Sequence, residues 1–148
     1  MVMRVGVPKE IKPQENRIGL TPESVRVLTS NGHQVLIENN SGYEAGFDNE
    51  QYKKAGAKIV NNAEDIFNDS EIIVKVKEPL DSEIKMIREN QIIFTYLHLA
   101  AGKQLTEGLV KSKSVCIAYE TVTDNNGRLP LLAPMSAVAG RMSIQAGA

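Results

Sequence analysis

Short apolar runs rich in β-branched residues recur along the chain, and polar segments with turn residues or helical spacing separate them. Runs of this length predict buried strands, whereas apolar residues three or four positions apart predict helices that bury one face. We expect strands at residues 3–7, 34–38, 58–60, 72–77, 92–97 and 115–119. We expect helices at residues 22–30, 49–54, 63–67, 82–89, 103–111 and 131–148.

The alternation of strand and helix predicts an α/β fold with a mostly parallel sheet and helices on both faces, of the Rossmann-like or flavodoxin-like type. The last predicted helix is apolar nearly all round, so we expect it to be buried on most sides. We accordingly expect residues 1–130 to form one unit and residues 131–148 to begin a helix that leads out of it. A helix of this kind that stops without a cap is typical of a fragment of a longer protein.

Two lysines lie where a buried strand normally carries none. The predicted strand that begins at Ile72 contains Lys75 and Lys77, whose side chains share a face if the strand continues to Pro79. Lys77 would then lie at the carboxyl end of the strand, where open α/β sheets bind ligands. For Lys75 we favour a solvated position at the rim of the sheet, while Lys77 fits a rim position and a ligand-binding role equally well.

A histidine follows the next predicted strand. His98 comes at the end of the apolar run that begins at Ile92, so a neighbouring parallel strand would bring its imidazole to the same sheet edge as the Lys77 ammonium. Such a pair could hold an acid and transfer a proton to it. On pattern alone, however, a lone histidine after an apolar run is more often a structural group.

The polar segment of residues 9–20 is long for a compact domain, and long loops of this type are usually functional or disordered. Its Arg17 carries a planar guanidinium that can bind a carboxylate through two parallel hydrogen bonds. The commoner alternative is a surface arginine paired with Glu15. Near the other end of the chain, Ser136 lies in the first turn of the last predicted helix, where free backbone N–H groups favour an anion.

The composition is that of an ordinary globular domain, since 42% of the 148 residues are hydrophobic and 24% are charged. The net charge of -1 and the lack of tryptophan argue against a nucleic-acid-binding surface. No apolar run is long enough to span a membrane, and the amino terminus does not resemble a signal peptide. The single cysteine, Cys116, can form no internal disulfide, so we expect a small buried side chain and a reducing cytoplasm. Histidine and cysteine form no cluster that indicates a metal site.

Distinctive motifs are spread over the whole chain, namely R-V-G-V-P-K-E at residues 4–10, E-N-R-I-G-L-T-P at 15–22, K-V-K-E-P at 75–79, L-H-L-A at 97–100, A-Y-E-T-V at 118–122, P-L-L-A-P-M-S at 130–136 and A-G-R at 139–141. In their combination, order and spacing they resemble the bacterial L-alanine dehydrogenase family. Each motif alone would be weak, but together they are highly specific.

The resemblance implies a cytoplasmic, commonly hexameric enzyme that converts L-alanine, NAD and water reversibly into pyruvate, ammonium and NADH. Residues 1–130 would be the amino-terminal part of the catalytic, substrate-binding domain, and residues 131–148 the start of the helix leading to the NAD domain. Ser136 would contact NAD. Because the rest of the NAD site would lie outside the chain, we expect the 148-residue chain alone to be inactive.

The resemblance also implies roles for individual residues, matched motif by motif. Arg17 and Lys77 would bind the substrate carboxylate, and His98 would be the proton donor and acceptor. Tyr96 and Met135 would line the substrate pocket. The second acid/base group of the family is an aspartate of the nucleotide domain, which would lie outside this chain.

Two alternatives stay open. The amino-terminal domain of the α subunit of nicotinamide nucleotide transhydrogenase shares the patterns R-x-G-x-P and R-x-x-x-T-P, but it is not expected to keep K-V-K-E-P, L-H-L-A and L-L-A-P-M together. A non-catalytic α/β ligand-binding module is the other alternative, because no G-x-G-x-x-G segment, which would bind a dinucleotide, follows any predicted strand. A coding sequence that continues into such a segment would favour the enzyme.

Overall fold

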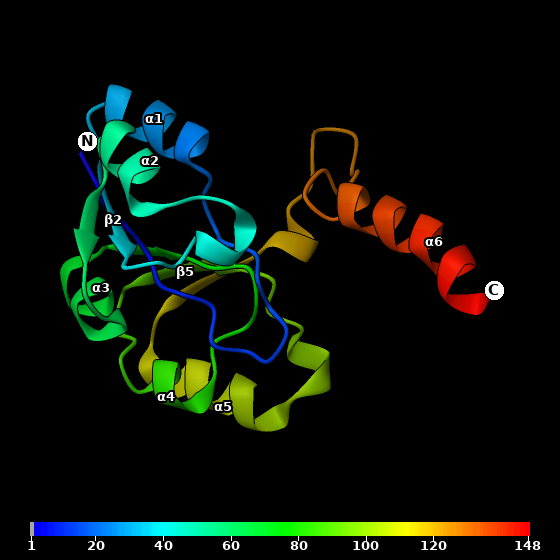
Figure 1. The fold of residues 1–148 in the computed structure, drawn as a ribbon. Coiled ribbons are helices and arrows are strands. Elements are labelled where there is room, and N and C mark those ends of the chain that lie inside the picture. Colours follow the sequence, from blue (N-terminus) through cyan, green and yellow to red (C-terminus); the bar gives the residue numbers. More distant parts are fainter. Residues whose placement is uncertain (1) are drawn as a thin grey trace.

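The computed structural model describes residues 2–148, which form a β-sheet flanked by helices (Figure 1). The strands are β1 (Arg4–Val7), β2 (Gln34–Glu38), β3 (Lys58–Val60), β4 (Ile72–Val74), β5 (Ile92–Thr95) and β6 (Val115–Ala118). The α-helices are α1 (Pro22–Ser30), α2 (Asn49–Lys54), α3 (Ala63–Asp69), α4 (Asp81–Ile84), α5 (Lys103–Ser112) and α6 (Ala133–Gly147). Single 3₁₀ turns are η1 (Tyr43–Ala45), η2 (Leu99–Ala101) and η3 (Tyr119–Thr121). Each predicted strand and helix is present, although several differ in length.

The sheet is parallel throughout and has the strand order β3-β2-β1-β4-β5-β6. This is the order of the doubly wound Rossmann fold, so the predicted fold class is confirmed. The direction of winding reverses between β1 and β4, where Val5 pairs with Ile72 and Gly6 pairs with Ile73. Ligands of such sheets bind outside the carboxyl ends of the strands at this switch point.

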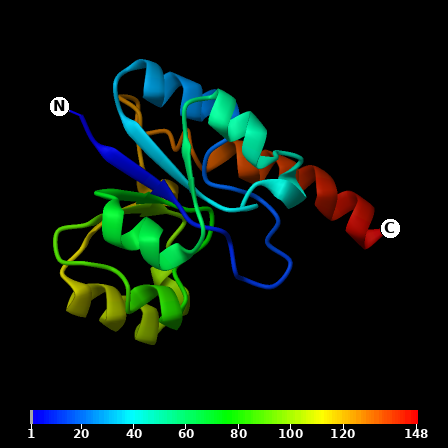
Figure 2. The ribbon, with the colours of Figure 1, turned by 60° about the vertical axis from the view of Figure 1, so that its left-hand side comes forward.

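Helices cover both faces of the sheet, as Figure 2 shows with α1 and α2 above and α3 and α5 below. On the first face Val25 of α1 and Tyr52 of α2 pack into one apolar core. On the second face Phe67 of α3 and Leu109 of α5 pack into another. Cys116, which we expected to be buried, is half-buried at the margin of the second core.

Local sequence explains where most helices begin. The Thr21 hydroxyl accepts the Ser24 N–H at 3.3 Å, and Asp48 and Gln51 cap α2 reciprocally. The prediction for α4 is wrong, because the helix begins at Asp81 itself and ends at Ile84 instead of residue 89. Glu83 stabilises the first turn, because its carboxylate accepts the Leu80 N–H at 2.9 Å.

Helix α6 extends away from the sheet (Figure 1), and all of its residues are exposed within this chain. The expected burial of this helix is therefore not found among residues 2–148. Val138, Met142 and Ile144 present apolar surface to solvent. The pattern of small and apolar residues predicted the helix, but it did not predict a packing partner.

Candidate functional site

The segment that follows β1 folds back across the carboxyl ends of β4 and β5. Gly19 makes this close approach possible, because a β-carbon at this position would lie 2.7 Å from the carbonyl oxygen of Val74. No side chain tolerates such a distance from the backbone, so only glycine fits here. The loop that carries Arg17 is thereby placed directly on the end of β4.

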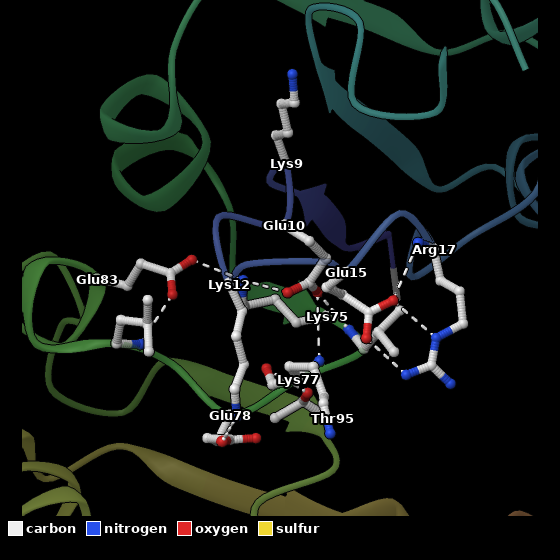
Figure 3. A network of polar contacts seen from close by, with 12 residues as sticks. Lys9, Glu10, Lys12, Glu15, Arg17, Lys75, Lys77, Glu78, Glu83 and Thr95 are labelled. Carbon is white, nitrogen blue, oxygen red and sulfur yellow. Dashed lines mark hydrogen bonds and ion pairs between the residues drawn. The ribbon is translucent and has the colours of Figure 1, made fainter. Parts of the chain in front are cut away.

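Lys75 is the charged centre of this end of the sheet (Figure 3). Its side chain is only 1% exposed, and its ammonium contacts the carboxylates of Glu10 at 3.2 Å and Glu83 at 2.6 Å. The predicted position of Lys75 at the solvated rim is therefore wrong. The physical reason is that a buried ammonium is tolerated when carboxylates pair with it, and one of these partners is distant in the sequence.

β4 ends at Val74, before either lysine, so the strand alternation expected to place Lys75 and Lys77 on one face does not extend to them. The Lys77 side chain is half-buried, and both its backbone N–H and its backbone carbonyl are hydrogen-bonded to side chains. The Lys77 N–H donates to Glu10 Oε1 at 3.3 Å, and the Thr95 hydroxyl donates to the Lys77 carbonyl at 2.9 Å. None of the ion pairs in the described part of the chain includes the Lys77 ammonium.

Arg17 is paired with Glu15, which is the alternative that the sequence left open. Arg17 Nε donates to Glu15 Oε1 at 2.7 Å and Nη2 donates to Oε2 at 2.6 Å. The remaining Nη1 faces the Met135 sulfur at 3.8 Å. The side-chain hydrogen bond from Arg17 is the main reason why the pKa of Glu15 lies below its ordinary value, and the charge of Lys77 acts in the same direction. The positive charge of Lys77 thus contributes to the lowered pKa of Glu15.

Arg17, Tyr96 and Met135 line one open cavity of about 700 Å³, whose other walls are mostly apolar. The Tyr96 hydroxyl donates to the Leu131 carbonyl at 2.6 Å, which ties the segment before α6 to the end of β5. The Tyr96 ring packs edge-on against Tyr119 with centroids 4.9 Å apart. Three of the predicted site residues are thus brought together at the carboxyl ends of the strands.

His98 follows β5 in a left-handed backbone conformation, with φ of 48°. The Glu120 carboxylate stabilises this turn, because it accepts the N–H groups of His98 at 2.8 Å and of Leu97 at 3.0 Å. Burial raises the pKa of Glu120, but hydrogen bonds from the N–H groups of His98, Glu120 itself and Leu97, together with the charge of His98, outweigh it, so the pKa lies below its ordinary value. Glu120 is therefore a carboxylate that fixes the backbone of the histidine.

The imidazole of His98 is exposed and lies beside the ring of Tyr96, with centroids 6.5 Å apart and planes inclined by 29°. It lines a second cavity together with Glu78 and Gln104, not the cavity of Arg17. Since β4 and β5 pair in parallel, Lys77 and His98 do follow neighbouring strands, as predicted. The Tyr96 ring, which lines the first cavity, contacts the His98 imidazole, which lines the second.

Sequence reasoning gave no role to Glu10, Thr95 and Glu120, whose side chains hold the backbone of Lys77 and His98. The sequence carried only a weak signal for them, because each lies within three residues of a strand end, in or close to a distinctive motif. A short strand predicts nothing about which side chain will accept the N–H groups beyond its end. That information lies in contacts such as Glu10 to Val76, 66 positions apart.

NAD has no complete site in the described residues. The Ser136 N–H, predicted to be free for an anion, donates to the Leu132 carbonyl at 3.1 Å. The sequence also contains no G-x-G-x-x-G segment. Between residues 2 and 148, no group of three or more His, Cys, Asp or Glu side chains is arranged to hold a metal ion. Over the same residues, every helix is too short or too polar to cross a membrane.

Comparison with known proteins gives a consistent picture. The family model described as "Alanine dehydrogenase/PNT, N-terminal domain" matches residues 6–139. The alanine dehydrogenase of Staphylococcus epidermidis is 53% identical over 146 residues, which are 99% of this chain and 39% of that protein. The alanine dehydrogenase of Halomonas elongata is 49% identical with the same coverage. The chain thus spans about 39% of the length of these curated relatives.

Solved structures agree with the sequence comparison. A structure described as L-alanine dehydrogenase matches with a TM-score of 0.93 and 53% identity, over 99% of this chain and 40% of that one. A transhydrogenase from Sinorhizobium meliloti matches with a TM-score of 0.74 and 26% identity, over 79% of this chain and 35% of that one. Because the family model covers most of the chain and the fold agrees, the chain belongs to the family of alanine dehydrogenase/PNT N-terminal domains.

Proposed function

We propose that this chain is the substrate-binding part of an NAD-dependent L-alanine dehydrogenase, which interconverts L-alanine and pyruvate with release or uptake of ammonium. The observation that carries the proposal is the placement of Arg17, Lys77 and His98 on the segments after β1, β4 and β5, around the switch point of the sheet. Relatives named alanine dehydrogenase, at 49–53% identity, support the same function.

Arg17 and Lys77 would bind the substrate carboxylate from two sides. Glu15 occupies the Nε edge of the Arg17 guanidinium and leaves Nη1, beside Met135, for a ligand. The Lys77 ammonium makes no ion pair with another described residue and so can accept the same carboxylate. Two cations on one carboxylate fix the direction of the α-carbon, and Tyr96 and Met135 would form the wall beside it.

His98 would donate a proton to the carbonyl oxygen of pyruvate during amination and remove a proton during deamination. Histidine suits both directions, because its side chain ordinarily exchanges a proton near neutral pH. Glu120 fixes the His98 backbone through two N–H groups, so the imidazole is carried on a rigid turn. Its exposed position within this chain leaves it accessible to a ligand in front of the sheet edge.

NAD would accept the hydride when bound, with Ser136 as one contact. The rest of its site, and the aspartate that the family uses as a second acid/base group, would come from residues beyond these 148. Following the same family resemblance, we propose a cytoplasmic homo-oligomer, most simply a hexamer. Oligomerisation would also give the exposed apolar residues of α6 something to pack against.

The test is the formation of NADH from L-alanine and NAD by the full-length gene product that contains this chain, beside Lys77→Ala and the control Lys53→Ala. Lys53 is a surface lysine of α2 that pairs only with Glu50. We expect Lys77→Ala to raise the KM for alanine and lower kcat while the KM for NAD is unchanged, because Lys77 would touch only the substrate. Kinetics equal to those of the control would remove Lys77 from the site.

The transhydrogenase alternative rests on the structure with 26% identity. It predicts that the full-length protein reduces one nicotinamide nucleotide with another in the absence of alanine. A protein that binds pyruvate but turns over neither alanine nor nucleotides would instead support the ligand-binding module. The three outcomes exclude one another, so one set of assays decides among them.

A further inference from the structure

The backbone N–H and carbonyl of Lys77 both form hydrogen bonds with side chains and not with a neighbouring strand. Its N–H donates to the Glu10 carboxylate and its carbonyl accepts from the Thr95 hydroxyl. Glu10 comes from the segment after β1, whereas Thr95 is the last residue of β5. Both side chains are buried, with 8% and 0% of their residues exposed. The Lys77 backbone is therefore held between the segments that follow or end β1 and β5, the two neighbours of β4 in the sheet.

Glu10 is itself held in place by the buried charges around it. Its Oε1 also accepts the Val76 N–H at 2.6 Å, while its Oε2 contacts the Lys75 ammonium at 3.2 Å. Glu83 completes the cluster from α4 by contacting the same ammonium at 2.6 Å. A carboxylate with these partners has no alternative position in the core, so it can define where the backbone after β4 runs.

We propose that Glu10 and Thr95 are positioning residues for Lys77, which place its ammonium against the substrate carboxylate. This inference rests on the proposed function for the identity of that carboxylate. Lysine is a point charge on a flexible stem of four carbons, so its side chain alone cannot fix its position. The backbone from which the side chain extends must be fixed instead, and the hydrogen bonds of the Lys77 N–H and carbonyl do this.

Thr95 offers the sharper test, because Thr95→Val keeps the shape of the side chain and removes only the hydroxyl. We expect the KM for alanine to rise about five- to tenfold, the loss of one well-made hydrogen bond, with the KM for NAD unchanged. Thr95→Ser, which keeps the hydroxyl, should restore the wild-type KM. The matched control is Thr29→Val, because Thr29 donates an equivalent bond to the Ala55 carbonyl at 2.7 Å, away from the site.

A purely structural role for Thr95 predicts a different result. Thr95→Val and Thr29→Val would then lower the thermal unfolding temperature alike and leave the KM for alanine unchanged in the folded protein. That outcome would overturn the positioning role. A rise in the KM for alanine in Thr95→Val alone, with rescue by Thr95→Ser, would establish it.

Glu10 is tested by comparing two carboxylates that neutralise the same lysine. Glu10→Gln and Glu83→Gln each remove one charge from Lys75, but only Glu10 touches Lys77. We expect a severalfold rise in the KM for alanine in Glu10→Gln, because an amide oxygen is a weaker acceptor than a carboxylate. Equal effects of the two substitutions would reduce Glu10 to a structural partner of Lys75.

Amide hydrogen exchange separates this inference from the proposed function, since it requires no turnover. The peptide that contains Val76 and Lys77 should exchange faster in Glu10→Gln than in Glu83→Gln, because Glu10 protects both N–H groups. If the wild-type protein turned over no alanine, the proposed function would fail. The exchange data would still decide whether Glu10 fixes the backbone at Lys77. Equal exchange in the two variants would refute the positioning role of Glu10, even if the enzyme were active.

Discussion

Lys75 and Lys77 stand two positions apart in the sequence but have opposite surroundings. Lys75 is buried between two carboxylates, whereas Lys77 is half-buried without an ion-pair partner in the described residues. β4 ends at Val74; beyond it, backbone hydrogen bonds to the β5 segment continue at Lys75 and Val76, while the Glu10 side chain accepts the Val76 N–H. At the residue scale, the pairing of the Lys75 charge and the lack of an ion pair at Lys77 among the described residues agree with the ligand-binding role proposed for Lys77.

His98→Ala should abolish most of kcat in the full-length enzyme while NADH still binds with its usual Kd. A group that only transfers protons acts on the chemical step and not on cofactor affinity. NADH fluorescence titration measures the second quantity independently of turnover. Turnover at the wild-type rate would refute the role of His98, and lost NADH binding would point to a structural role for the turn that Glu120 holds.

Glu15→Gln should lower the free energy of unfolding slightly at neutral pH but not in acid. The hydrogen bond from Arg17 lowers the pKa of Glu15 below its ordinary value of 4.5, so the pair contributes stability above that value and loses it as the pH falls through the lowered pKa. The Arg17 side chain is 44% exposed, so we expect a difference of about 0.5–1 kcal/mol at pH 7 at most.

Urea unfolding of both forms at several pH values between 7 and about 3 measures this difference. The gap between wild-type and Glu15→Gln should close as the pH falls below 4.5. A gap that stays constant across this range would show that Glu15 contributes through packing and not through its charge.

At the scale of elements, residue pattern located every strand and helix, because apolar periodicity and caps such as Thr21 and Asp48 are local signals. The carboxyl ends of β4 and β5 were predicted three and two residues too long. There the Val76 N–H is taken by Glu10, a contact that no local pattern contains. The end of α4 was missed for a related reason, because Glu83 turns inward to Lys75.

Lys75→Met should destabilise the protein by about 3–5 kcal/mol, because it leaves the buried carboxylates of Glu10 and Glu83 facing each other without a counter-charge. The control Lys53→Met removes an exposed pair with Glu50 and should cost about 0–1 kcal/mol. Chemical denaturation of both variants compares the two directly. Similar losses would mean that the buried cluster has rearranged or hydrated, which would contradict its role as a fixed anchor.

At the scale of the whole molecule, the fold class could be predicted from the alternation of strand and helix, but the geometry of the site could not. Its residues come from segments as far apart as Arg17 and Met135, which contact each other at 3.8 Å. Motif resemblance supplied the candidate residues, while the Arg17–Glu15 pairing and the separate cavity of His98 emerged only in three dimensions. The exposed face of α6 was likewise beyond what a helical pattern can predict.

The 148-residue chain on its own should show no NAD reduction with L-alanine, whereas the full-length gene product should. The described residues contain a cluster suited to a carboxylate but no dinucleotide fingerprint, and hydride transfer needs both. Parallel assays of the two proteins at equal molar concentration check this. Measurable alanine-dependent NADH formation by the short chain would show that residues 1–148 hold NAD without the expected second domain.

The contact between Glu10 and Val76 also has a consequence for folding during synthesis. These residues lie 66 positions apart, so a nascent chain exposes the Glu10 carboxylate to water until β4 has left the ribosome. We expect the Lys75–Glu10 ion pair to become buried only once both strands have been synthesised and β1 has paired with β4. We expect chains that end before β4 not to bind the proposed substrate, and a carboxylate that binds only the folded protein should favour completion of folding.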